Sequence, residues 1–371
     1  MFFKKRIHKN IFSFILQKNT KSIWVIEELS RKNRILKYLS GNDEIVIVKG
    51  ERIFSIKKSL DFLWLNSAGK SIKVDKNNIL INFQNLGYLD ELSKEKGVFL
   101  FNYTKENGNR YFCFYDDLSK KIVWENNISS TLYLLDNTGL FYVEFGEKLE
   151  KNIIKGANLF SNHFWVFDTS SFGTFTKDFG EIQAVEVNQL IGVWNKQLIV
   201  LLNNGEFIGL NVENGKLLWQ KKQVDNNFTK QNIAFGFGLP YHPFLDKKNG
   251  VIFILQGNIF IEFNLNTQKA SYLWNSKDYE EKNHLFFRHT KLFKDNIYFT
   301  ASKFPDLGNI NIIGVFNIKK REIIWKHTFK FEKGTFIKNE PNSIQVNETN
   351  LYLLDSKGTL HIFQKQETTI T

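Results

Sequence analysis

The sequence is poor in the residues on which several classes of protein depend. Its 371 residues include one cysteine, one methionine and four prolines. A single thiol cannot form an internal disulfide, and it excludes zinc sites that are built from several cysteines. No apolar run approaches the roughly 18 to 20 residues that a membrane-spanning helix needs. The sequence therefore predicts neither a disulfide framework nor a transmembrane segment, and we expect a cytoplasmic protein.

The sequence also lacks the short motifs of common catalytic and nucleotide-binding sites, among them GxxxxGK[ST], HExxH, GxSxG and CxxC. The seven histidines are dispersed. His284 and His289 are close in sequence, but the alternation of side chains along a strand would send them to opposite faces. We therefore expect no metal site, and no catalytic residue can be assigned.

The formal net charge of +12 raises the question of a nucleic-acid partner. The basic residues are scattered in short clusters, and each cluster lies beside a turn signal between apolar runs. These clusters are Lys57-Lys58, Lys120-Lys121, Lys221-Lys222, Lys247-Lys248 and Lys319-Lys320-Arg321. We therefore predict solvated hairpin turns and no specific nucleic-acid site, with a basic stripe as the alternative.

The first twenty residues are basic and amphipathic. Ile7, Ile11 and Phe14 would share one face of a helix, with lysines around them. The apolar part is shorter than that of a signal peptide and no small residues follow it. We expect a short helix or strand docked on the protein's own core, with a helix on a membrane surface as the alternative. Residues 1–20 thus form a basic N-terminal segment, and residues 21–371 a single domain.

Residues 197–219, QLIVLLNNGEFIGLNVENGKLLW, consist of three apolar runs separated by two polar turns. The first run, residues 198–202, is continuously apolar, which predicts a strand covered on both faces. The turns, Asn203-Asn204-Gly205 and Glu213-Asn214-Gly215-Lys216, combine Asn and Gly, which tolerate a positive φ. The segment therefore predicts three antiparallel strands, the last of which ends at Trp219.

The same order of strands and turns recurs along the chain, and most copies close at a tryptophan. We predict that these tryptophans are structural and fill the space between adjacent sheets: Trp64, Trp124, Trp219, Trp274 and Trp325. Three copies carry, eight positions before the tryptophan, a short polar residue whose side chain can bond the backbone of the next turn: Asp116, Asn211 and Asn317. A spacing of about 50 residues is typical of β-propellers.

The copy that runs from Asn211 to Trp219 is similar to the Asp-x-x-Thr-Gly-Lys-x-x-Trp stretch that ends the units of quinoprotein-like propellers. Residues 116–124 and 317–325 match it more loosely. The chain thus resembles the quinoprotein-like (PQQ-like or WD40-like) β-propeller repeat family over most of residues 40–365. The quinone- and metal-binding residues of that family cannot be placed in this sequence, so we expect no cofactor.

The hairpins predict an all-β, seven-bladed β-propeller of four-stranded antiparallel blades, with six or eight blades as alternatives. The unit near residue 155 has no tryptophan at the expected place. The last unit, residues 351–364, supplies only two strands. We expect residues 22–27 or 35–39 to complete it, so that N- and C-terminal strands close the ring.

A loop with two of the four prolines, Gly236 to Phe244, is the candidate binding site. Its stiff aromatic residues would lose little entropy on binding, so we predict partner contacts through Tyr241, His242 and Phe244. An ordinary connection between blades is the alternative. Our hypothesis is a non-catalytic propeller that binds another protein, which its basic charge suggests is acidic, with a bacterial immunity protein that neutralises a toxin as one candidate role. The alternative is an enzyme with its site in the central channel, either a quinone-dependent oxidoreductase or a sugar hydrolase or lyase.

Overall fold

The computed structural model describes the strands between residues 2 and 366 and many of their connections. The main ranges outside the description are 17–22, 59–62, 75–79, 94–97, 106–109, 128–131, 145–150, 159–162, 177–179, 222–242, 276–284, 339–343 and 367–371. Side chains are described mainly from residue 98 onward. The chain divides into two compact units, which are described separately below.

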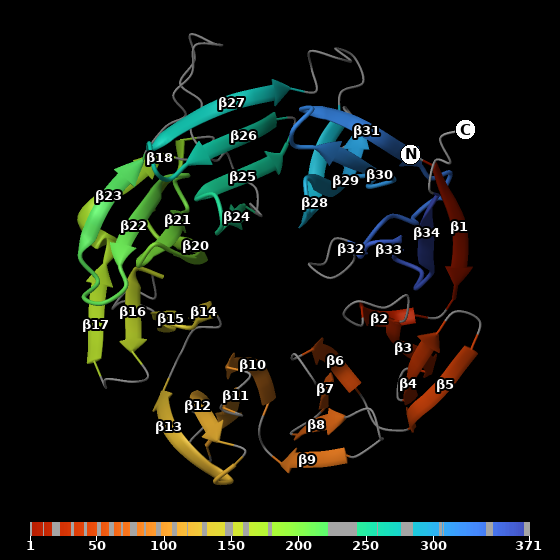
Figure 1. Cartoon of the computed structure of the whole chain (residues 1–371), viewed down its shortest axis with the longest axis horizontal. Helices are drawn as coiled ribbons and strands as arrows, with labels where there is room; N and C mark the ends of the chain where they lie inside the picture. The colour runs from red at the N-terminus through yellow and green to blue at the C-terminus, as the bar shows by residue number, and fades with distance from the viewer. Residues whose placement is uncertain are drawn as a thin grey trace. The chain divides into compact units, whose positions relative to one another are not determined.

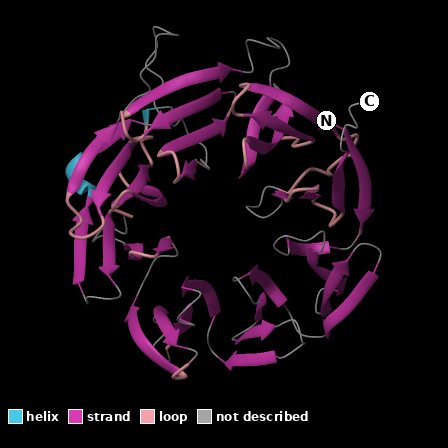
Figure 2. Ribbon diagram, viewed as in Figure 1, coloured by secondary structure: helices cyan, strands magenta, loops and turns pink. Residues whose placement is uncertain are grey.

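Almost all of the described secondary structure is β-strand (Figure 2). The strands form eight four-stranded sheets and one two-stranded sheet, and in every strand pair whose register is recorded the strands are antiparallel. The helical segment η1 is a single 3₁₀ turn, Thr169–Phe172. This arrangement agrees with the prediction of an all-β chain built from four-stranded antiparallel sheets.

The first unit comprises Met1–Tyr88, Leu255–Phe260 and Leu273–Thr371. Its sheets are, in strand order, β2 (Ile11–Leu16), β3 (Ile23–Ser30), β4 (Asn33–Ser40) and β5 (Asp43–Lys49); β6 (Ile53–Lys58), β7 (Leu63–Ser67), β8 (Lys70–Val74) and β9 (Leu80–Gln84); β28 (Leu285–Phe293), β29 (Asn296–Lys303), β30 (Ile312–Asn317) and β31 (Glu322–Thr328); and β32 (Ile344–Val346), β33 (Asn350–Leu354), β34 (Leu360–Gln366) and β1 (Phe2–His8).

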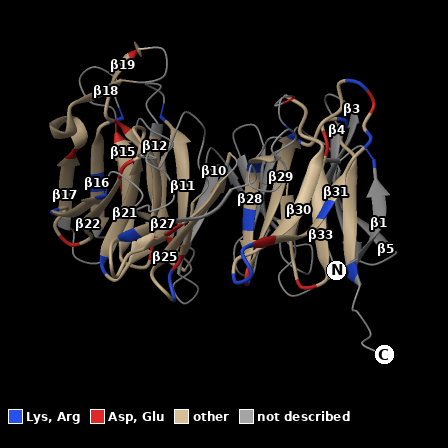
Figure 3. Cartoon of the chain, turned by 90° about the horizontal axis from the view of Figure 1, so that it is seen from above, with Lys and Arg blue, Asp and Glu red and all other residues tan. Residues whose placement is uncertain are grey.

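The second unit comprises Leu89–Ile254 and Ile261–Tyr272. Its sheets are β10 (Gly87–Ser93), β11 (Val98–Thr104), β12 (Arg110–Asp116) and β13 (Lys121–Asn127); β14 (Tyr133–Asp136), β15 (Gly139–Glu144), β16 (Ile153–Asn158) and β17 (His163–Asp168); β20 (Val187–Trp194), β21 (Gln197–Leu202), β22 (Phe207–Asn211) and β23 (Leu217–Lys221); and the hairpin β18 (Thr174–Thr176) and β19 (Ile182–Ala184). The residues of β24 (Phe244–Asp246), β25 (Val251–Gln256), β26 (Ile259–Asn264) and β27 (Lys269–Asn275) are divided between the units. Figure 1 traces the sheets, and Figure 3 shows that hairpin β18–β19 projects beyond the ends of β15 and β16.

The two ends of the chain share one sheet. β1 pairs antiparallel with β34, from Phe2 opposite Gln366 to His8 opposite Leu360. The first residues are thus strands, one of the two conformations expected for them. The prediction that residues 22–27 or 35–39 complete the last sheet is wrong, because these residues form β3 and β4 of a sheet of their own.

The structure has eight four-stranded sheets where the sequence predicted seven, with eight as one alternative. The apolar runs and turns between residues 45 and 64 have the order of one repeat that closes at Trp64, but they span two sheets: β5 ends one sheet, and β6 and β7 begin the next. β5 contains Val46-Ile47-Val48 and carries no tryptophan, so the sequence has no marker of this boundary. Trp64 consequently lies in the second strand of its sheet, unlike the other repeat tryptophans.

The turn between the third and fourth strands is held by a side chain in the expected way. In three sheets a carboxylate or amide oxygen at the end of the third strand accepts a hydrogen bond from a backbone N–H in the turn. These bonds run from Leu118 N to Asp116 Oδ1 (2.9 Å), from Glu213 N to Asn211 Oδ1 (2.8 Å) and from Lys320 N to Asn317 Oδ1 (2.9 Å). Each turn then reverses through one residue with positive φ: Lys120, Gly215 and Arg321. Only Gly adopts that conformation without a steric penalty.

Tryptophans of the last strands pack against the following sheet. In the second unit, Trp165 of β17 donates its indole N–H to the carbonyl oxygen of Val212 (2.8 Å), beyond β22. Its ring lies against Gly156 of its own sheet and Gly215 of the next. The repeat near residue 155 therefore does have a closing tryptophan, and the prediction that it has none is wrong. Trp165 lies opposite Gly156 as Trp219 lies opposite Gly209.

Apolar faces of successive sheets form the core of each unit. In the second unit, Phe112 and Phe114 of β12 pack with Leu140 and Tyr142 of β15. Residues of β15 to β17 then pack with those of β20 to β22. In the first unit, residues of β29 and β30 pack with those of β32 to β34. Because the middle strands touch a neighbour on both faces, their sequences are continuously apolar.

Candidate interaction surface

The exposed large apolar side chains that the structure describes lie mainly in the second unit, for which most side chains are described. Among the described residues, all but Phe336 belong to it: Leu118, Ile122, Val123, Phe164, Val166, Ile182, Leu217 and Leu218. Six of these side chains lie on β13, β17 and β23, which are the last strands, and therefore edge strands, of three successive sheets. Contiguous exposed apolar side chains mark interaction sites in many proteins, so each of these three edge strands is a candidate.

On two of these strands a β-bulge exposes the apolar pair. In β13, Phe114 faces Trp124 and Tyr115 faces Ile122, so Val123 is the extra residue. In β23 the corresponding extra residue is Leu218, between Leu217 and Trp219. A bulge interrupts the ladder and twists the edge, which hinders pairing with another strand. Partners would therefore meet these strands through side chains.

Lysines flank both bulges. Lys121 precedes Ile122 and Val123, and Lys216 precedes Leu217; both lysines are exposed. The ion pairs of the described residues include neither lysine. These residues form two patches, Lys121, Ile122 and Val123 on β13, and Lys216 with Leu217 and Leu218 at the start of β23. The β14–β17 sheet lies between their two sheets in chain order, and we name the two patches together the bulged-strand surface. It combines apolar area with uncompensated positive charge.

β17 differs from its neighbours because it has no bulge. Its six residues pair in unbroken register with β16, from Asn158–His163 to Ile153–Asp168. Phe164 and Val166 point to one face and are exposed, whereas Trp165 between them is only 7% exposed. β17 is therefore a regular edge strand that carries exposed apolar side chains.

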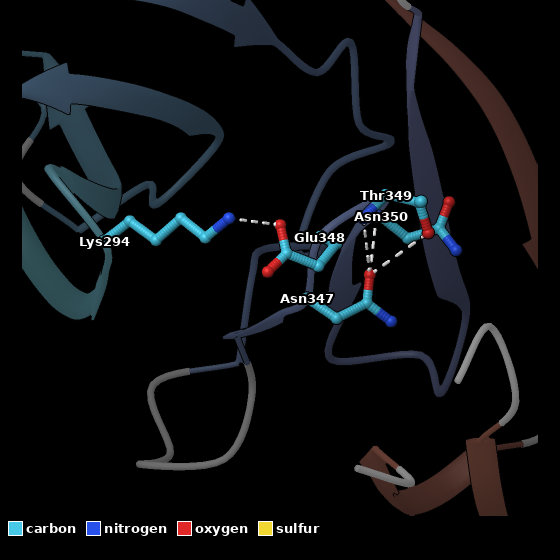
Figure 4. Close-up of polar contacts among 5 residues, drawn as sticks. All are labelled: Lys294, Asn347, Glu348, Thr349 and Asn350. Atoms are coloured by element: carbon cyan, nitrogen blue, oxygen red, sulfur yellow. Dashed lines mark hydrogen bonds and ion pairs between the residues drawn. The ribbon is translucent and has the colours of Figure 1, made fainter. Parts of the chain in front are cut away.

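The turns at one end of the sheets are polar, and some of their charges pair with those of another turn. Successive antiparallel strands reverse direction, so the first and third turns of a sheet lie at the same end. In the second unit, Lys247 Nζ lies 2.6 Å from Asp136 Oδ2. In the first unit, Lys294 Nζ lies 2.6 Å from Glu348 Oε2 (Figure 4).

The turn that carries Glu348 is fixed by the preceding residue. Asn347 Oδ1 accepts hydrogen bonds from the backbone N–H groups of Thr349 (3.0 Å) and Asn350 (2.8 Å) (Figure 4). Both members of the Lys294–Glu348 pair are more than half exposed, so the pair contributes at most about 1 kcal/mol. Because these turn charges already have partners, the bulged-strand surface is the better candidate for binding.

Solved structures with the same arrangement of strands are β-propellers. The computationally designed Ika8 protein is 10% identical, with 96% of each chain covered and a TM-score of 0.57. Sqt1 from Saccharomyces cerevisiae, a WD40 propeller, is 10% identical over 99% of each chain, with a TM-score of 0.56. Sqt1 from Chaetomium thermophilum, solved bound to the N-terminus of the ribosomal protein L10, is 10% identical over 96% of this chain and 100% of its own, with a TM-score of 0.55.

The chain has a β-propeller fold. At 10% identity the likeness extends to the fold alone. No family model and no curated protein sequence matches the chain. Within the described residues of the propeller, no helix has the length and apolar character needed to span a bilayer.

The candidate binding loop of the propeller lies largely outside the described residues. Tyr241 and His242 belong to the range 222–242, which is not described. Phe244 is the first residue of β24, where it is half-buried and pairs with Phe253. His284 is also outside the description, and His289 is buried in β28. The described residues contain no group of three or more side chains suited to a metal ion.

Sequence reasoning missed the bulged-strand surface, although a signal was present. In both strands a lysine is followed by two apolar residues and a tryptophan, Lys121 to Trp124 and Lys216 to Trp219. Strict alternation would expose one apolar residue of the pair and bury the other. The bulge breaks this alternation, and only the registers reveal it.

A buried acid–histidine pair in the last sheet is structural. Asp355 Oδ2 lies 2.9 Å from His361 Nε2, and Asp355 Oδ1 accepts the backbone N–H groups of Lys357 and Thr359. Burial acts to raise the pKa of Asp355, but the hydrogen bonds from His361 and Thr359 outweigh it and hold the pKa below its usual value. Both side chains are buried, so the pair fixes the turn between β33 and β34 and is closed to a substrate.

Proposed function

We propose that this β-propeller is a non-catalytic protein-binding module, and that its bulged-strand surface docks an acidic, apolar segment of another protein. The observation that carries the proposal is the pair of exposed apolar side chains on each bulge, directly preceded by an uncompensated lysine. Apolar area supplies the affinity, and the lysines select for negative charge and speed up association.

The proposal also draws on the fold. The Sqt1 propeller of Chaetomium thermophilum is bound to the N-terminus of a ribosomal protein, so a propeller of this size serves as a docking platform in that case. We extend the same kind of role to this chain, with an unrelated partner of acidic character. The identity of the partner does not follow from the likeness.

Three finer points belong to the same proposal. The eight four-stranded sheets correspond to eight blades. β1 completes the last sheet and so closes the ring of blades. The protein acts in the cytoplasm. Its role as an immunity protein that neutralises a toxin is the specific form of the hypothesis, and a toxin recovered as the stoichiometric partner would support it.

The test is affinity capture from native lysate with variants that introduce a negative charge. Val123→Glu and Leu218→Glu place a carboxylate on the bulged-strand surface, where it would repel an acidic partner. Phe336→Glu is the control, because it makes the same change at an exposed apolar residue away from that surface. We expect the wild type and the control to retain one stoichiometric partner, identified by mass spectrometry, and the two variants to lose it. Retention of the partner by Val123→Glu and Leu218→Glu, or background alone with the wild type, would refute the proposal.

A further inference from the structure

We propose that two copies of this chain pair edge to edge through β17, so that their β14–β17 sheets join into one continuous antiparallel sheet. This inference goes beyond the proposed function, because it involves a second copy of the chain and a strand outside the bulged-strand surface. It stands on three features of β17: an open main-chain edge, a register that its own residues specify, and the absence of the devices that block the neighbouring edges.

The main-chain edge of β17 is open. Among the described strands, β17 pairs with β16 alone and lies at the edge of its sheet (Figure 1). Just beyond β17, the N–H of Thr169 bonds the carbonyl oxygen of Asn152 (2.9 Å), so the main chain of residue 169 points toward β16. Since these groups alternate along an antiparallel strand, the N–H and C=O groups of Phe164 and Val166 point away from β16.

The segment that follows β17 covers the face of the sheet to which Trp165 points. Phe172 and Phe175, from η1 and β18, pack against the cluster that contains Trp165 and Val185. Trp165 and Phe167 point to that face, whereas Phe164 and Val166 point to the opposite one. The insertion between β17 and β20 therefore covers the face of Trp165 and leaves the side chains of Phe164 and Val166 exposed.

The residues of β17 specify how a second copy would pair. A two-fold axis at Trp165 sets Phe164 of each copy opposite Val166 of the other, and both residues have outward-pointing main-chain groups. Each Phe164–Val166 pair then exchanges main-chain hydrogen bonds across the two copies. The two pairs lie on one face, and an aromatic residue opposite a β-branched one is a favourable cross-strand combination. A slip of two residues would set Phe164 opposite the charged Asp168. The pattern is thus self-complementary in the register centred on Trp165.

Three other last strands of the described sheets are blocked. β13, β23 and β31 each carry a bulge next to their tryptophan. Bulges are a common means by which edge strands avoid pairing. β17 carries none, and no lysine or proline lies within it. An unblocked edge with exposed apolar residues is the kind of edge that pairs with another copy.

The test is the oligomeric state of the full chain, measured by sedimentation velocity over a wide range of concentration. Val166→Lys adds a charge to the open edge. Val123→Lys is a matched control, because both valines are 59% exposed and on last strands, but Val123 lies in a bulge. We expect a dimer for the wild type and for Val123→Lys, and a monomer for Val166→Lys. A wild type that stays monomeric at the highest concentration, or a Val166→Lys protein that stays dimeric, would overturn the inference.

Two further variants keep the test independent of charge and folding. Val166→Pro removes an outward-pointing N–H and breaks no hydrogen bond to β16. Edge strands tolerate proline at such positions, so we expect a folded monomer by circular dichroism and sedimentation. For the register, Phe164→Cys protein is mixed with Val166→Cys protein under mild oxidation; the native Cys113 is buried. We expect disulfide-linked dimers in the mixture and few with either variant alone. Equal cross-linking of the unmixed variants would contradict the register.

Discussion

Trp165 joins two sheets of the second unit, and its contacts allow a quantitative prediction. It is 7% exposed, and its indole N–H bonds the carbonyl oxygen of Val212 at 2.8 Å. We expect Trp165→Ala to lower the free energy of unfolding by about 3–5 kcal/mol, the usual cost of removing a buried tryptophan. Trp165→Phe keeps most of the ring but leaves Val212 without its donor, so about 1–3 kcal/mol is expected.

Gly215, in the turn of the next sheet, allows the contact itself to be tested. A Cβ at Gly215 would lie 2.4 Å from Trp165 Cε3, and its φ is +71°. Gly215→Ala therefore combines overpacking, about 1–3 kcal/mol, with about 1–2 kcal/mol of backbone strain. Gly180→Ala is the matched control, because Gly180 has a φ of +80° and no heavy atom within 4 Å of a Cβ. It isolates the strain.

The assay is urea unfolding followed by far-ultraviolet circular dichroism, for the single variants and for the double variant Trp165→Ala/Gly215→Ala. Removing the ring removes the overpacking, so the double variant should be more stable than the sum of the single losses by about 1–3 kcal/mol. If the two losses are additive, or if Gly215→Ala costs no more than Gly180→Ala, then the ring of Trp165 does not lie against this turn. The proposed contact between the two sheets would then be wrong.

Three other predictions concern single residues. Arg321 has a φ of +56°, so Arg321→Gly should relieve strain and raise the free energy of unfolding by about 0.5–1 kcal/mol, whereas Arg321→Ala should give no gain in the same urea assay. Burial raises the pKa of Cys113 to about 12, so its thiol should not react with Ellman's reagent at pH 8 until urea unfolds the sheet; rapid reaction of the native protein would contradict its burial. The pKa of Asp355 is lowered in the folded state, so its contribution to stability is complete above its unfolded pKa and is lost as the pH falls through the folded value. Asp355→Asn should therefore be less stable than the wild type at neutral pH and lose less free energy of unfolding on acidification. Parallel pH profiles of the two proteins would refute this.

Much of the fold could be predicted because each repeat carries short-range sequence patterns, namely apolar runs, turns and a closing tryptophan. The turn after Asn211, with its Asn and Gly residues, fixed both the spacing and the strand direction, and the side-chain bond at Asn211 was expected from its position alone. The first 60 residues could not be divided into sheets correctly, because β5 carries no tryptophan. Pairing of β1 with β34 is also invisible in the sequence, since no local pattern records a partner more than 350 residues away.

The candidate surface was harder to predict than the fold. Composition favoured the proline-rich loop that ends at Phe244, yet Phe244 itself is a half-buried strand residue. Exposure of both Leu217 and Leu218 depends on a register shift between two strands. Such a shift is decided by how the whole sheet packs, so single-sequence periodicity cannot report it.

β17 shows how one departure from the repeat has two consequences. In β13 and β23 a lysine and two apolar residues precede the tryptophan, and the second apolar residue forms the bulge. In β17 the sequence His163-Phe164-Trp165 leaves no room for that extra residue, so the strand stays in register to its end. Because of this shortening, Trp165 does not stand at the position that the repeat predicts for its tryptophan. The same shortening leaves an edge strand without a bulge. If the bulge is the device that keeps the other edges apart, then inserting one residue between Phe164 and Trp165 should restore it, and the resulting protein should sediment as a monomer with its sheet intact.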